Sequence, residues 1–498
     1  MCTSLNHIPT LLRLAPRCPT LKVIVSLDPI SNGTELAGTS KSDLLREMAQ
    51  GTGIKIHYIG DVEVQGEKSL LPARPPQPEH IVTINYTSGT TGNPKGVTLL
   101  HSNAVAAMSA SMCISEQTDG DVICSYLPLA HIYERITEGL ALWAGAAIGY
   151  FHGNILELVD DLKLLRPTSF ISVPRLFNRF GGVIKAQTVE QAGIKGALSR
   201  HVVNTKLANL EHAAPGKATN KHAIYDRIWA KKVAAALGLE RARTVISGSA
   251  PIDPTLHQFL RVVLANNFVQ GYGLTETYAV ALVQIMGDLS AGNCGAVSPA
   301  TEICLRDVPD MEYHSTDKPH PRGEVLIRGP TVFKEYYKNA EETQKAITED
   351  GWFCSGDIAT VDDLGRFKII DRKKNVLKLA QGEYISPERI ENVYLAYLPY
   401  LATAYVHGDS SQSNLVAIFG LAPDLFSVFV SKILGKTIGP TQIFELQLAA
   451  KDPNVQKAVA KELKEVGKKA KLNKYENAAA FRILVDPFSI DNGLLTPT

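Results

Sequence analysis

The sequence predicts a layered α/β fold, with a large N-terminal domain of mixed sheets and helices and a smaller α+β C-terminal domain. Short apolar runs of strand length recur along the chain, and longer periodic segments such as residues 192–239 separate them. Strands that alternate with helices in this way are typical of α/β layers. The clearest runs are VICSYLP, TSFISVP, RTVISGSA and FVQGYGL. A chain of 498 residues, 45% of them hydrophobic and 20% charged, has the composition of a globular enzyme with roughly two to four domains.

The N-terminal region contains two predicted strands joined by a connector. LKVIVSL, from Leu21 to Leu27, has the apolar character of a buried parallel strand. IVTINYT, from Ile81 to Thr87, predicts a strand that leads into a glycine-rich loop. The connector LLPARPPQPEH between them is rich in proline, which predicts exposed irregular structure. Basic residues near the start suggest a transit peptide, but Pro9, Pro16 and Pro19 oppose the amphipathic helix that such a peptide needs.

The longest apolar run is GLALWAGAAIGYF, from Gly139 to Phe151, bounded by Glu138 and His152. It is too short to cross a bilayer, because a membrane-spanning helix takes about 20 residues. We therefore expect a buried core segment in this region.

The pattern changes after Gly323. RGEVLIRGP and GRFKIIDRKKNVLKL predict antiparallel strands joined by charged turns, and the smaller α+β domain is expected beyond Arg372. Residues Lys451–Lys474 predict a helix with lysines on its solvated face rather than a membrane-binding helix. Four apolar residues recur in this segment near helical spacing: Val455, Val459, Leu463 and Val466.

Charge and cysteine content exclude some functions. The net charge is +1 and no basic stripe is interleaved with aromatic residues, so nucleic acid is not an expected partner. The seven cysteines are scattered, without a C-x-x-C pair or the spacing of a metal site. Reduced thiols in an intracellular protein are the simplest interpretation.

The loop YTSGTTGNPKG, from Tyr86 to Gly96, has the composition of a phosphate-binding site. Glycines allow backbone amides to approach an anion, while hydroxyl groups and a lysine supply further donors. The spacing differs from the Walker motif G-x-x-x-x-G-K-[S/T], so another kind of phosphate chemistry is indicated. A merely flexible turn would not need a lysine after an ordered run of this kind. The residues concerned are Thr87, Ser88, Gly89, Thr90, Thr91, Gly92 and Lys95.

Two further motifs, SGSAP and QGYGLTET, each place small residues at the carboxyl end of a predicted strand. Open α/β sheets bind ligands at this edge. Tyr272 offers a flat face for a purine, Thr275 a hydroxyl for a phosphate, and Glu276 a carboxylate for Mg²⁺. A glutamate alone can equally be a first-turn helix residue, but its position inside GYGLTET favours the metal.

The motifs GWFCSGDIA and IIDRKKN contribute Asp357 and Arg372. One carboxylate can accept hydrogen bonds from two ribose hydroxyls, and an arginine can add donors to the ribose or to a phosphate. Taken alone, an aspartate–arginine pair is more commonly a surface ion pair. The nearby Lys373, Lys374, Lys378 and Gly382 are ambiguous on chemical grounds.

Taken together and in this order, YTSGTTGNPKG, GYGLTET, DGWFCSGD and DRKKNVLKLAQGEYISPERIE resemble the acyl-adenylate-forming superfamily. The run DRKKNVLKLAQGEYISPERIEN is similar to that of its long-chain fatty acyl-CoA synthetases. The resemblance covers nearly the whole chain from Leu21 onward. It implies a large AMP-binding domain over residues 1–371 and a small mobile domain over residues 372–498, which swings about a hinge at Lys374.

The resemblance implies two half-reactions. The carboxylate of a fatty acid attacks the α-phosphate of ATP and releases pyrophosphate, and the thiol of CoA then attacks the acyl-adenylate. ATP, Mg²⁺ and CoA are therefore the expected cofactor and co-substrates, and the loop from Thr87 to Lys95 would hold the departing β- and γ-phosphates.

The same resemblance implies a role for each remaining residue. Glu276 would hold Mg²⁺, Thr275 would contact the α-phosphate, and Asp357 with Arg372 would hold the ribose. His131 would border the pocket for the acyl carboxylate, although a core or capping histidine is an equally weighted alternative. Gly382 would let the pantetheine arm of CoA pass close to the backbone. The adenine would lie against Gly248, Ser249, Ala250, Gln270, Gly271, Tyr272 and Gly273.

The resemblance also implies more sequence than is printed. It places a substantial N-terminal portion before the strand at Leu21, and a lysine that contacts the α-phosphate just beyond Thr498. We expect adenylation to be slower by about a hundredfold or more without such a lysine.

Three functions remain open at this point. The first is a long-chain fatty acid–CoA ligase. The second is a ligase for another carboxylic acid, such as an aromatic or specialised-metabolite acid. The third is a non-catalytic nucleotide-binding remnant, which the missing lysine favours. An intracellular protein associated peripherally with the endoplasmic-reticulum or peroxisomal membrane fits the first function, because fatty acids dissolve in membranes.

Overall fold

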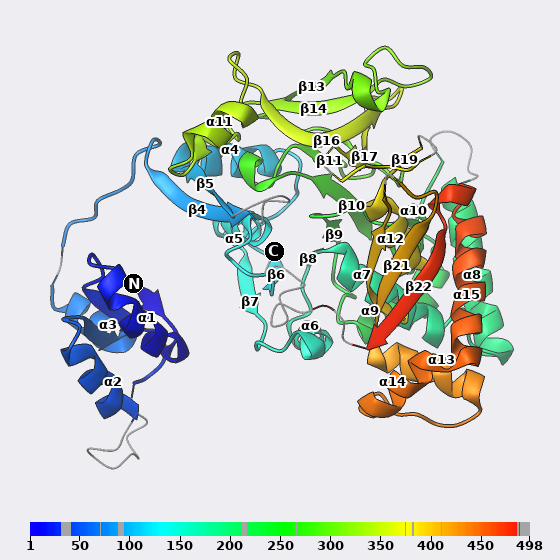
Figure 1. Cartoon of the computed structure of the whole chain (residues 1–498), viewed down its shortest axis with the longest axis horizontal. Helices are drawn as coiled ribbons and strands as arrows, with labels where there is room; N and C mark the ends of the chain where they lie inside the picture. Colours follow the sequence, from blue (N-terminus) through cyan, green and yellow to red (C-terminus); the bar gives the residue numbers. More distant parts are fainter. Residues whose placement is uncertain are drawn as a thin grey trace. The chain divides into compact units, whose positions relative to one another are not determined.

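The computed structural model describes residues 1–30, 41–69, 71–87, 94–211, 217–264, 266–373, 375–380, 383–409, 411–485 and 488. The chain divides into two compact units, Met1–Pro76 and Gln77–Thr498, and each has its own hydrophobic core (Figure 1). The division falls within the proline-rich connector that the sequence predicts.

The unit Met1–Pro76 contains a small parallel sheet. Its strands, in spatial order, are β1 (Cys2–Thr3), β2 (Val23–Ser26) and β3 (Lys55–Tyr58). Its helices are α1 (Ile8–Leu14), α2 (Lys41–Gln50) and α3 (Ile59–Glu67). Ile24 of β2 packs against Ile8 and Leu12 of α1, which confirms the strand expected at Leu21–Leu27.

Helix α1 corrects the expectation drawn from the prolines. Pro9 lies in its first turn, where the missing backbone N–H costs no hydrogen bond. Ile8 and Leu12 are one turn apart and both are buried, so this segment is an amphipathic helix after all.

A seven-stranded sheet is the centre of the unit Gln77–Thr498. The strands β6 to β10 are parallel to one another, and β11 pairs antiparallel with β10 and β12. The four apolar runs that open the sequence prediction correspond to β6, β8, β9 and β10. In spatial order the strands are β12 (Ala296–Val297), β11 (Leu282–Val283), β10 (Asn267–Tyr272), β9 (Thr244–Ser247), β8 (Ser169–Ser172), β6 (Val122–Ser125) and β7 (Ala147–Tyr150).

Alternate residues of the parallel strands face opposite sides of this sheet. Phe170 of β8, Val245 of β9 and Phe268 of β10 point into a core that they share with five helices. The intervening residues, such as Ile171 and Ile246, face the side covered by α4 (His101–Met112) and α5 (Ile132–Ala144). The five helices are α6 (Leu158–Leu165), α7 (Pro174–Gln187), α8 (Gly193–Glu211), α9 (Lys231–Ala236) and α10 (Pro254–Leu264), with the π-helix η4 (Asp226–Ala230) before α9.

The long apolar run Gly139–Phe151 is not a buried segment. Its first half ends α5 and its second half forms the edge strand β7, with Gly145 in the left-handed conformation between them. Leu142, Trp143 and Tyr150 are 72%, 50% and 69% exposed. The prediction is wrong because a helix end and an edge strand each leave one side uncovered, which apolar composition alone does not reveal.

Two antiparallel sheets lie next in the same unit. The first confirms the antiparallel pairing predicted after Gly323, and its strands in spatial order are β13 (Glu302–Arg306), β14 (Arg322–Arg328), β16 (Phe353–Val361) and β17 (Phe367–Arg372). The second contains β15 (Glu335–Tyr336), β5 (Lys95–Leu100) and β4 (Ile81–Thr87), and the short helix α11 (Ala340–Ala346) follows β15. In the β4–β5 hairpin Thr87 pairs with Lys95, so the two ends of the glycine-rich loop lie opposite each other.

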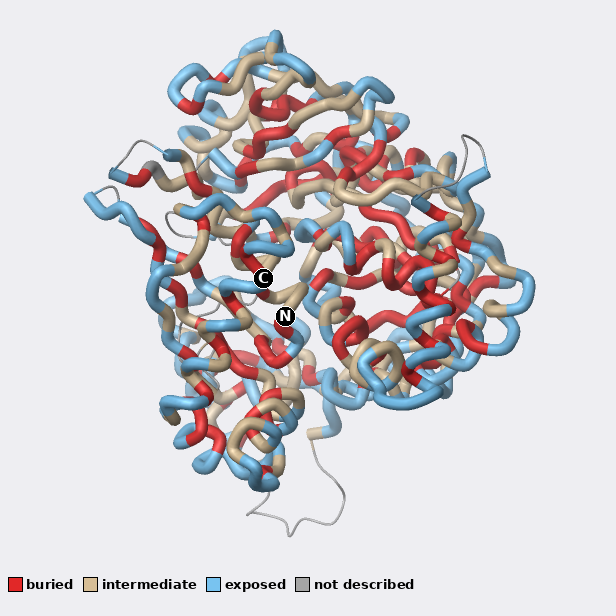
Figure 2. Tube along the Cα trace, turned by 90° about the vertical axis from the view of Figure 1, so that its right-hand side faces the viewer, coloured by how far each residue is buried: buried red, intermediate tan, exposed pale blue. Residues whose placement is uncertain are grey.

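The described residues from Leu377 to Val485 form a further α+β assembly with its own core, which includes Tyr394, Phe419 and Phe426. In Figure 2 the buried stretches, in red, gather inside the structure and the surface loops are exposed. The strands are β18 (Leu377–Lys378), β19 (Tyr384–Ile385), β20 (Leu401–His407), β21 (Leu415–Leu421) and β22 (Ala478–Val485), and the helices are α12 (Pro387–Tyr397), α13 (Pro423–Leu434), α14 (Ile443–Lys451) and α15 (Pro453–Lys469). The boundary between residues 371 and 372 stays a prediction.

Helix α15 confirms the helix predicted over Lys451–Lys474. Val455, Val459, Leu463 and Val466 are all buried on one side of it. Within the described part of the chain, no helix combines the length and the apolar character needed to cross a bilayer.

Candidate active site

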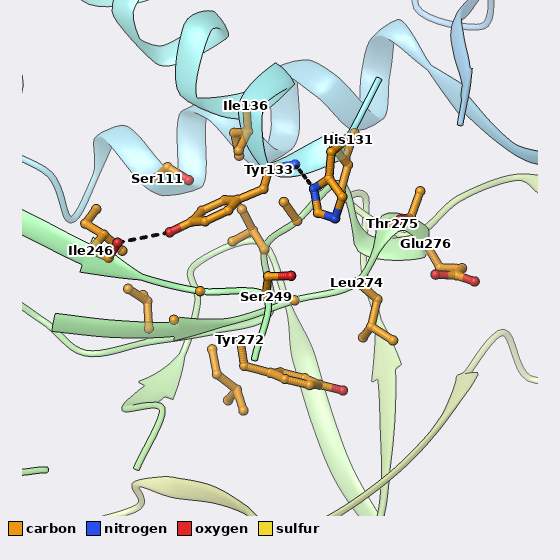
Figure 3. A pocket seen from close by; sticks show the side chains of 18 of the residues that line it. Ser111, His131, Tyr133, Ile136, Ile246, Ser249, Tyr272, Leu274, Thr275 and Glu276 are labelled. Carbon is orange, nitrogen blue, oxygen red and sulfur yellow. Dashed lines mark hydrogen bonds between the residues drawn. The ribbon is translucent and has the colours of Figure 1, made fainter. Parts of the chain in front are cut away.

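A cavity of about 1060 Å³ extends along the face of the parallel sheet that α4 and α5 cover. It reaches the carboxyl ends of β9 and β10, the edge at which α/β sheets bind ligands. Figure 3 shows Tyr133 and Ile136 on one side and Ile246 and Ser249 on the other, with the Tyr133 hydroxyl donating to the Ile246 carbonyl at 3.3 Å.

The sheet wall of this cavity is arranged in rows. β8, β9 and β10 run in register, so residues of the three strands lie side by side. The row nearer the carboxyl ends is apolar and consists of Ile171, Ile246 and Val269. The row two residues closer to the amino ends is polar and consists of Ser169, Thr244 and Asn267. Ile136 and Leu140 of α5 add apolar side chains to the lining.

The turn after β9 approaches α5 closely. A Cβ at Gly248 would lie 2.8 Å from the Tyr133 ring, so only glycine fits here without displacing that ring. Ser249 has a φ of 72°, the left-handed conformation that non-glycine residues seldom adopt. Both residues line the cavity, whereas Ala250 is exposed and is not part of the lining.

At the carboxyl end of β10, Gly271, Tyr272 and the following Gly273 line the cavity, but Gln270 does not. The Gln270 side chain is buried and donates to the sulfur of Cys294 at 3.3 Å. A Cβ at Gly273 would lie 2.1 Å from the carbonyl oxygen of Ala279, so this turn requires glycine. Of the residues predicted to border the adenine, the structure thus brings all except Ala250 and Gln270 to the lining of this cavity.

Asp357 connects Tyr272 to Arg372. The Tyr272 hydroxyl donates to one carboxylate oxygen of Asp357 at 2.6 Å, and Arg372 Nε lies 3.1 Å from the other. Asp357 and Arg372 are cross-strand partners in β16 and β17, which explains their contact despite their separation in sequence. Asp357 is 3% exposed, and this burial raises its pKa while the charge of Arg372 opposes the rise.

Glu276 lies in the short turn η5 (Thr275–Thr277) and is buried. The Tyr336 hydroxyl donates to its Oε1 at 2.8 Å, and burial raises its pKa. The Lys95 ammonium lies 5.0 Å from the centroid of the Tyr336 ring and forms an ion pair with Glu342 of α11. Thr275, Glu276 and Lys95 all line the cavity.

Tyr336 and Glu342 were missed by the sequence reasoning, because neither lies in a glycine-rich or charged motif. Glu324 was missed as well; it is buried beside the cavity and pairs with Arg306 at 2.8 Å and with Lys373 at 3.4 Å. Only the three-dimensional fold brings these side chains to the site.

His131 is the N-cap residue of α5, and its Nδ1 accepts a hydrogen bond from the backbone N–H of Tyr133 at 3.2 Å. It also lines the cavity, so the capping and pocket interpretations both describe its position. Burial lowers the pKa of His131. A neutral ring whose Nδ1 accepts carries its proton on Nε2, which is then a donor.

Several predicted residues lie outside the described part of the chain. These are Ser88, Gly89, Thr90, Thr91 and Gly92 of the first loop, together with Lys374 and Gly382. Near the expected hinge, Glu388 of α12 accepts a hydrogen bond from Asn375 at 2.5 Å and lies 3.9 Å from Arg372.

Known proteins are similar to this chain in sequence and in fold. A family model described as AMP-binding enzyme matches residues 2–337. Acyl-CoA ligase 891, peroxisomal, of Penicillium brevicompactum is 61% identical over 496 residues, which cover 100% of this chain and 70% of that protein. Long chain acyl-CoA synthetase 7, peroxisomal, of Arabidopsis thaliana is 41% identical over 454 residues, which cover 91% of this chain and 63% of that protein.

A solved structure shows the same fold. It is the A domain of a carboxylic acid reductase from Segniliparus rugosus in complex with AMP and a co-purified carboxylic acid. The TM-score is 0.75 at 25% identity, over 99% of this chain and 70% of that chain. Because the family model covers residues 2–337 and the relatives above match nearly the whole chain, this chain belongs to the AMP-binding enzyme family.

Proposed function

We propose that this chain activates a long-chain fatty acid with ATP and transfers the acyl group to CoA. The observation that carries the proposal is the composition of the cavity described above. Polar groups suited to a nucleotide lie at the carboxyl ends of β9 and β10, and an apolar row suited to an acyl chain lies directly beside them. The relatives named acyl-CoA ligase and long chain acyl-CoA synthetase support the same reaction.

In the first half-reaction, a carboxylate oxygen of the fatty acid would attack the α-phosphorus of ATP, and pyrophosphate would leave. Gly248, Ser249 and Tyr272 would border the adenine, and Asp357 with Arg372 would hold the ribose. Positioning the carboxylate and the phosphate next to each other supplies much of the rate enhancement in such a reaction.

Further residues would act on the charged groups of this step. Thr275 would contact the α-phosphate, and Lys95, opposite Thr87 at the ends of the first loop, would hold the outer phosphates. The Nε2–H group of His131 would donate a hydrogen bond to the fatty acid carboxylate and so orient it. The loop residues Ser88 to Gly92 keep their proposed role as hydrogen-bond donors to the β- and γ-phosphates.

Magnesium fits the side chains at this site. Mg²⁺ is usually held by one or two carboxylates together with substrate phosphates. The buried carboxylate of Glu276, oriented by Tyr336, is suited to be that protein ligand. Among the described residues no group of three His, Cys, Asp or Glu side chains could hold a metal ion without a substrate. When bound, the ion would neutralise charge that develops on the phosphates.

In the second half-reaction, the thiol of CoA would attack the acyl carbon, and AMP would leave. We assign the change between the two steps to a swing of residues 372–498 against residues 1–371, with the hinge at Lys374 and with Gly382 beside the pantetheine arm. The separate hydrophobic core of the C-terminal assembly supports its movement as one body.

A ligase for another carboxylic acid is the second candidate function. The polar row of Ser169, Thr244 and Asn267 favours it, because an acid with a hydroxyl or carbonyl group far from its carboxylate would find partners there.

Exchange of pyrophosphate into ATP tests the first half-reaction. The chain is assayed with palmitate, octanoate and a cinnamate-type acid, and thioester formation is then measured with CoA. We expect the fastest exchange with palmitate. Faster exchange with the aromatic acid would favour the second candidate, and ATP binding without either half-reaction would indicate a non-catalytic remnant.

We extend the proposal to location, because relatives from Penicillium and Arabidopsis are both named peroxisomal. The chain would act in the peroxisome, peripherally at its membrane. Organelle fractionation followed by a salt wash tests this: the chain should sediment with peroxisomes and be released by the wash.

A further inference from the structure

Lys95 already has a carboxylate as its ion-pair partner. Its ammonium pairs with Oε2 of Glu342, and the two side chains are only 23% and 29% exposed. Both line the cavity. An ion pair in such a partly enclosed position is screened less than one in open solvent.

The backbone of Glu342 is held in place beside Lys95. Asn339 caps α11 by accepting a hydrogen bond from the N–H of Glu342 at 3.2 Å. The N–H of Tyr336 donates to the hydroxyl of Thr343 at 2.9 Å and ties α11 to β15. The carboxylate of Glu342 is therefore the part of this contact that is free to move.

Glu342 also has a second cationic partner. Its Oε1 accepts from Lys345 at 3.0 Å, and Lys345 lines the cavity as well. Hydrogen bonds from Lys95 and Lys345 lower the pKa of Glu342 to about 2, so the carboxylate is charged at neutral pH. It can leave Lys95 without becoming an unpaired anion.

We propose that Glu342 is an internal counterion that occupies Lys95 while no nucleotide is bound and passes to Lys345 when the outer phosphates of ATP take Lys95. The inference rests on the proposed function, which assigns Lys95 to those phosphates. No covalent bond changes in this exchange. Because ATP must displace a carboxylate, Glu342 weakens ATP binding, and its return to Lys95 favours release of pyrophosphate.

The test compares Glu342→Gln with Glu341→Gln in the full chain. Glu341 is the adjacent residue, 79% exposed and paired with Lys345 at 2.6 Å, and it does not line the cavity. Both variants lose one negative charge at nearly the same place. Binding of ATP and of AMP is measured by calorimetry at two ionic strengths, since AMP lacks the outer phosphates.

We expect Glu342→Gln to lower the Kd for ATP by about three- to tenfold, in the range of a partly exposed ion pair. Its Kd for AMP, and both constants of Glu341→Gln, should stay within about twofold of the wild type. The gain in ATP affinity should shrink at the higher ionic strength because salt screens the contacts.

Other outcomes overturn the inference in distinguishable ways. Unchanged or weaker ATP binding by Glu342→Gln, or an equal change for AMP, would refute the counterion role and leave the proposed function standing. If the wild-type chain bound neither nucleotide, the proposed function would fail and the inference with it. Thermal melting of each variant separates a folding defect from a binding effect.

Lys345 supplies an independent check. Lys345→Gln should weaken ATP binding in the wild-type background, because the displaced Glu342 would lose its second partner. In the Glu342→Gln background the same substitution should have a smaller effect, which a double-mutant cycle measures. Equal effects of Lys345→Gln in both backgrounds would exclude the exchange.

Discussion

Asp357 connects three strands of the site through its side-chain contacts. It joins Tyr272 of β10 to Arg372 of β17 from its own position in β16. The carboxylate is nearly fully buried, so its hydrogen-bond partners and its charge fix its orientation.

Asp357→Asn should weaken ATP and AMP binding alike. The amide keeps the size of the side chain but removes the negative charge that pairs with Arg372 and that we propose to accept hydrogen bonds from the ribose. We expect both dissociation constants to rise by about ten- to a hundredfold. Calorimetry checks this, with Asp363→Asn as the control, because the Asp363 side chain is 90% exposed. A loss confined to ATP would contradict the assignment of Asp357 to the ribose.

The residues of the site divide into those that motifs reveal and those that only contacts reveal. Gly248, Tyr272 and Glu276 lie at or near strand ends and Asp357 lies within β16, all in motifs that contain glycine, and the fold places all of them on one cavity. Tyr336, Glu324 and Glu342 reach the same cavity from β15, β14 and α11. A single tyrosine or glutamate within an ordinary helix or strand carries no local signal of such a contact.

Among the elements, the parallel strands were the most predictable. β8, β9 and β10 have one face in the core and the other along the cavity, and their sequences are short, largely apolar runs followed by small residues. α5 and β7 were less predictable, because their apolar residues are divided between a covered and an uncovered side. Leu140 lines the cavity, whereas Leu142, two positions later, is exposed.

Leu140→Trp should shorten the acyl chain that the enzyme accepts. The larger side chain would fill space beside the apolar row of the sheet wall. We expect the KM for palmitate to rise by about tenfold and that for octanoate to change less. Leu142→Trp is the matched control on the same helix, and chain-length profiles of pyrophosphate exchange compare the two. Equal profiles would mean that the acyl chain does not pass Leu140.

Helix α12 contains a group that makes stability depend on pH. Glu391 accepts a hydrogen bond from the N–H of Val406 at 2.7 Å, and burial raises its pKa to about 7. The folded chain therefore binds a proton more strongly than the unfolded chain, so the free energy of unfolding falls as pH rises through the window from about 4.5 to about 7.

Glu391→Gln should remove most of that fall, because the amide can keep the Val406 contact without ionising. The melting temperature of the wild type should drop relative to the variant over this pH window, by an amount that corresponds to about 3 kcal/mol. Glu465→Gln, on the exposed face of α15, is the control. Parallel pH profiles for Glu391→Gln and the wild type would show that Glu391 does not titrate in this range.

On the scale of the whole molecule, three of the contacts of the C-terminal assembly join it to α7 and α10. A Cβ at Gly182 of α7 would lie 2.7 Å from Pro399, and Arg179 lies 3.6 Å from Asp424. The hydroxyls of Thr255 and Tyr397 are 3.4 Å apart. The swing that we propose for residues 372–498 would have to break these three contacts.

Gly182→Leu should disfavour this pose of the C-terminal assembly. We expect the rate of the half-reaction that uses this pose to fall by about tenfold, while the rate of the other half-reaction stays within about twofold of the wild-type rate. Pyrophosphate exchange and thioester formation from supplied acyl-adenylate measure them separately. Gly66→Leu, where a Cβ would have no atom within 4 Å, controls for the added bulk. Equal slowing of both half-reactions would point to local damage instead of a swing.

The in-register rows of β8, β9 and β10 divide the sheet wall of the cavity into regular intervals. Successive rows are two residues apart, about 6.6 Å along the strand direction. One row consists of Ile171, Ile246 and Val269, and the next consists of Ser169, Thr244 and Asn267. Exchanging the side chains of one row would therefore change the length of ligand that the cavity accepts in discrete steps, whichever of the three strands carries the substitution.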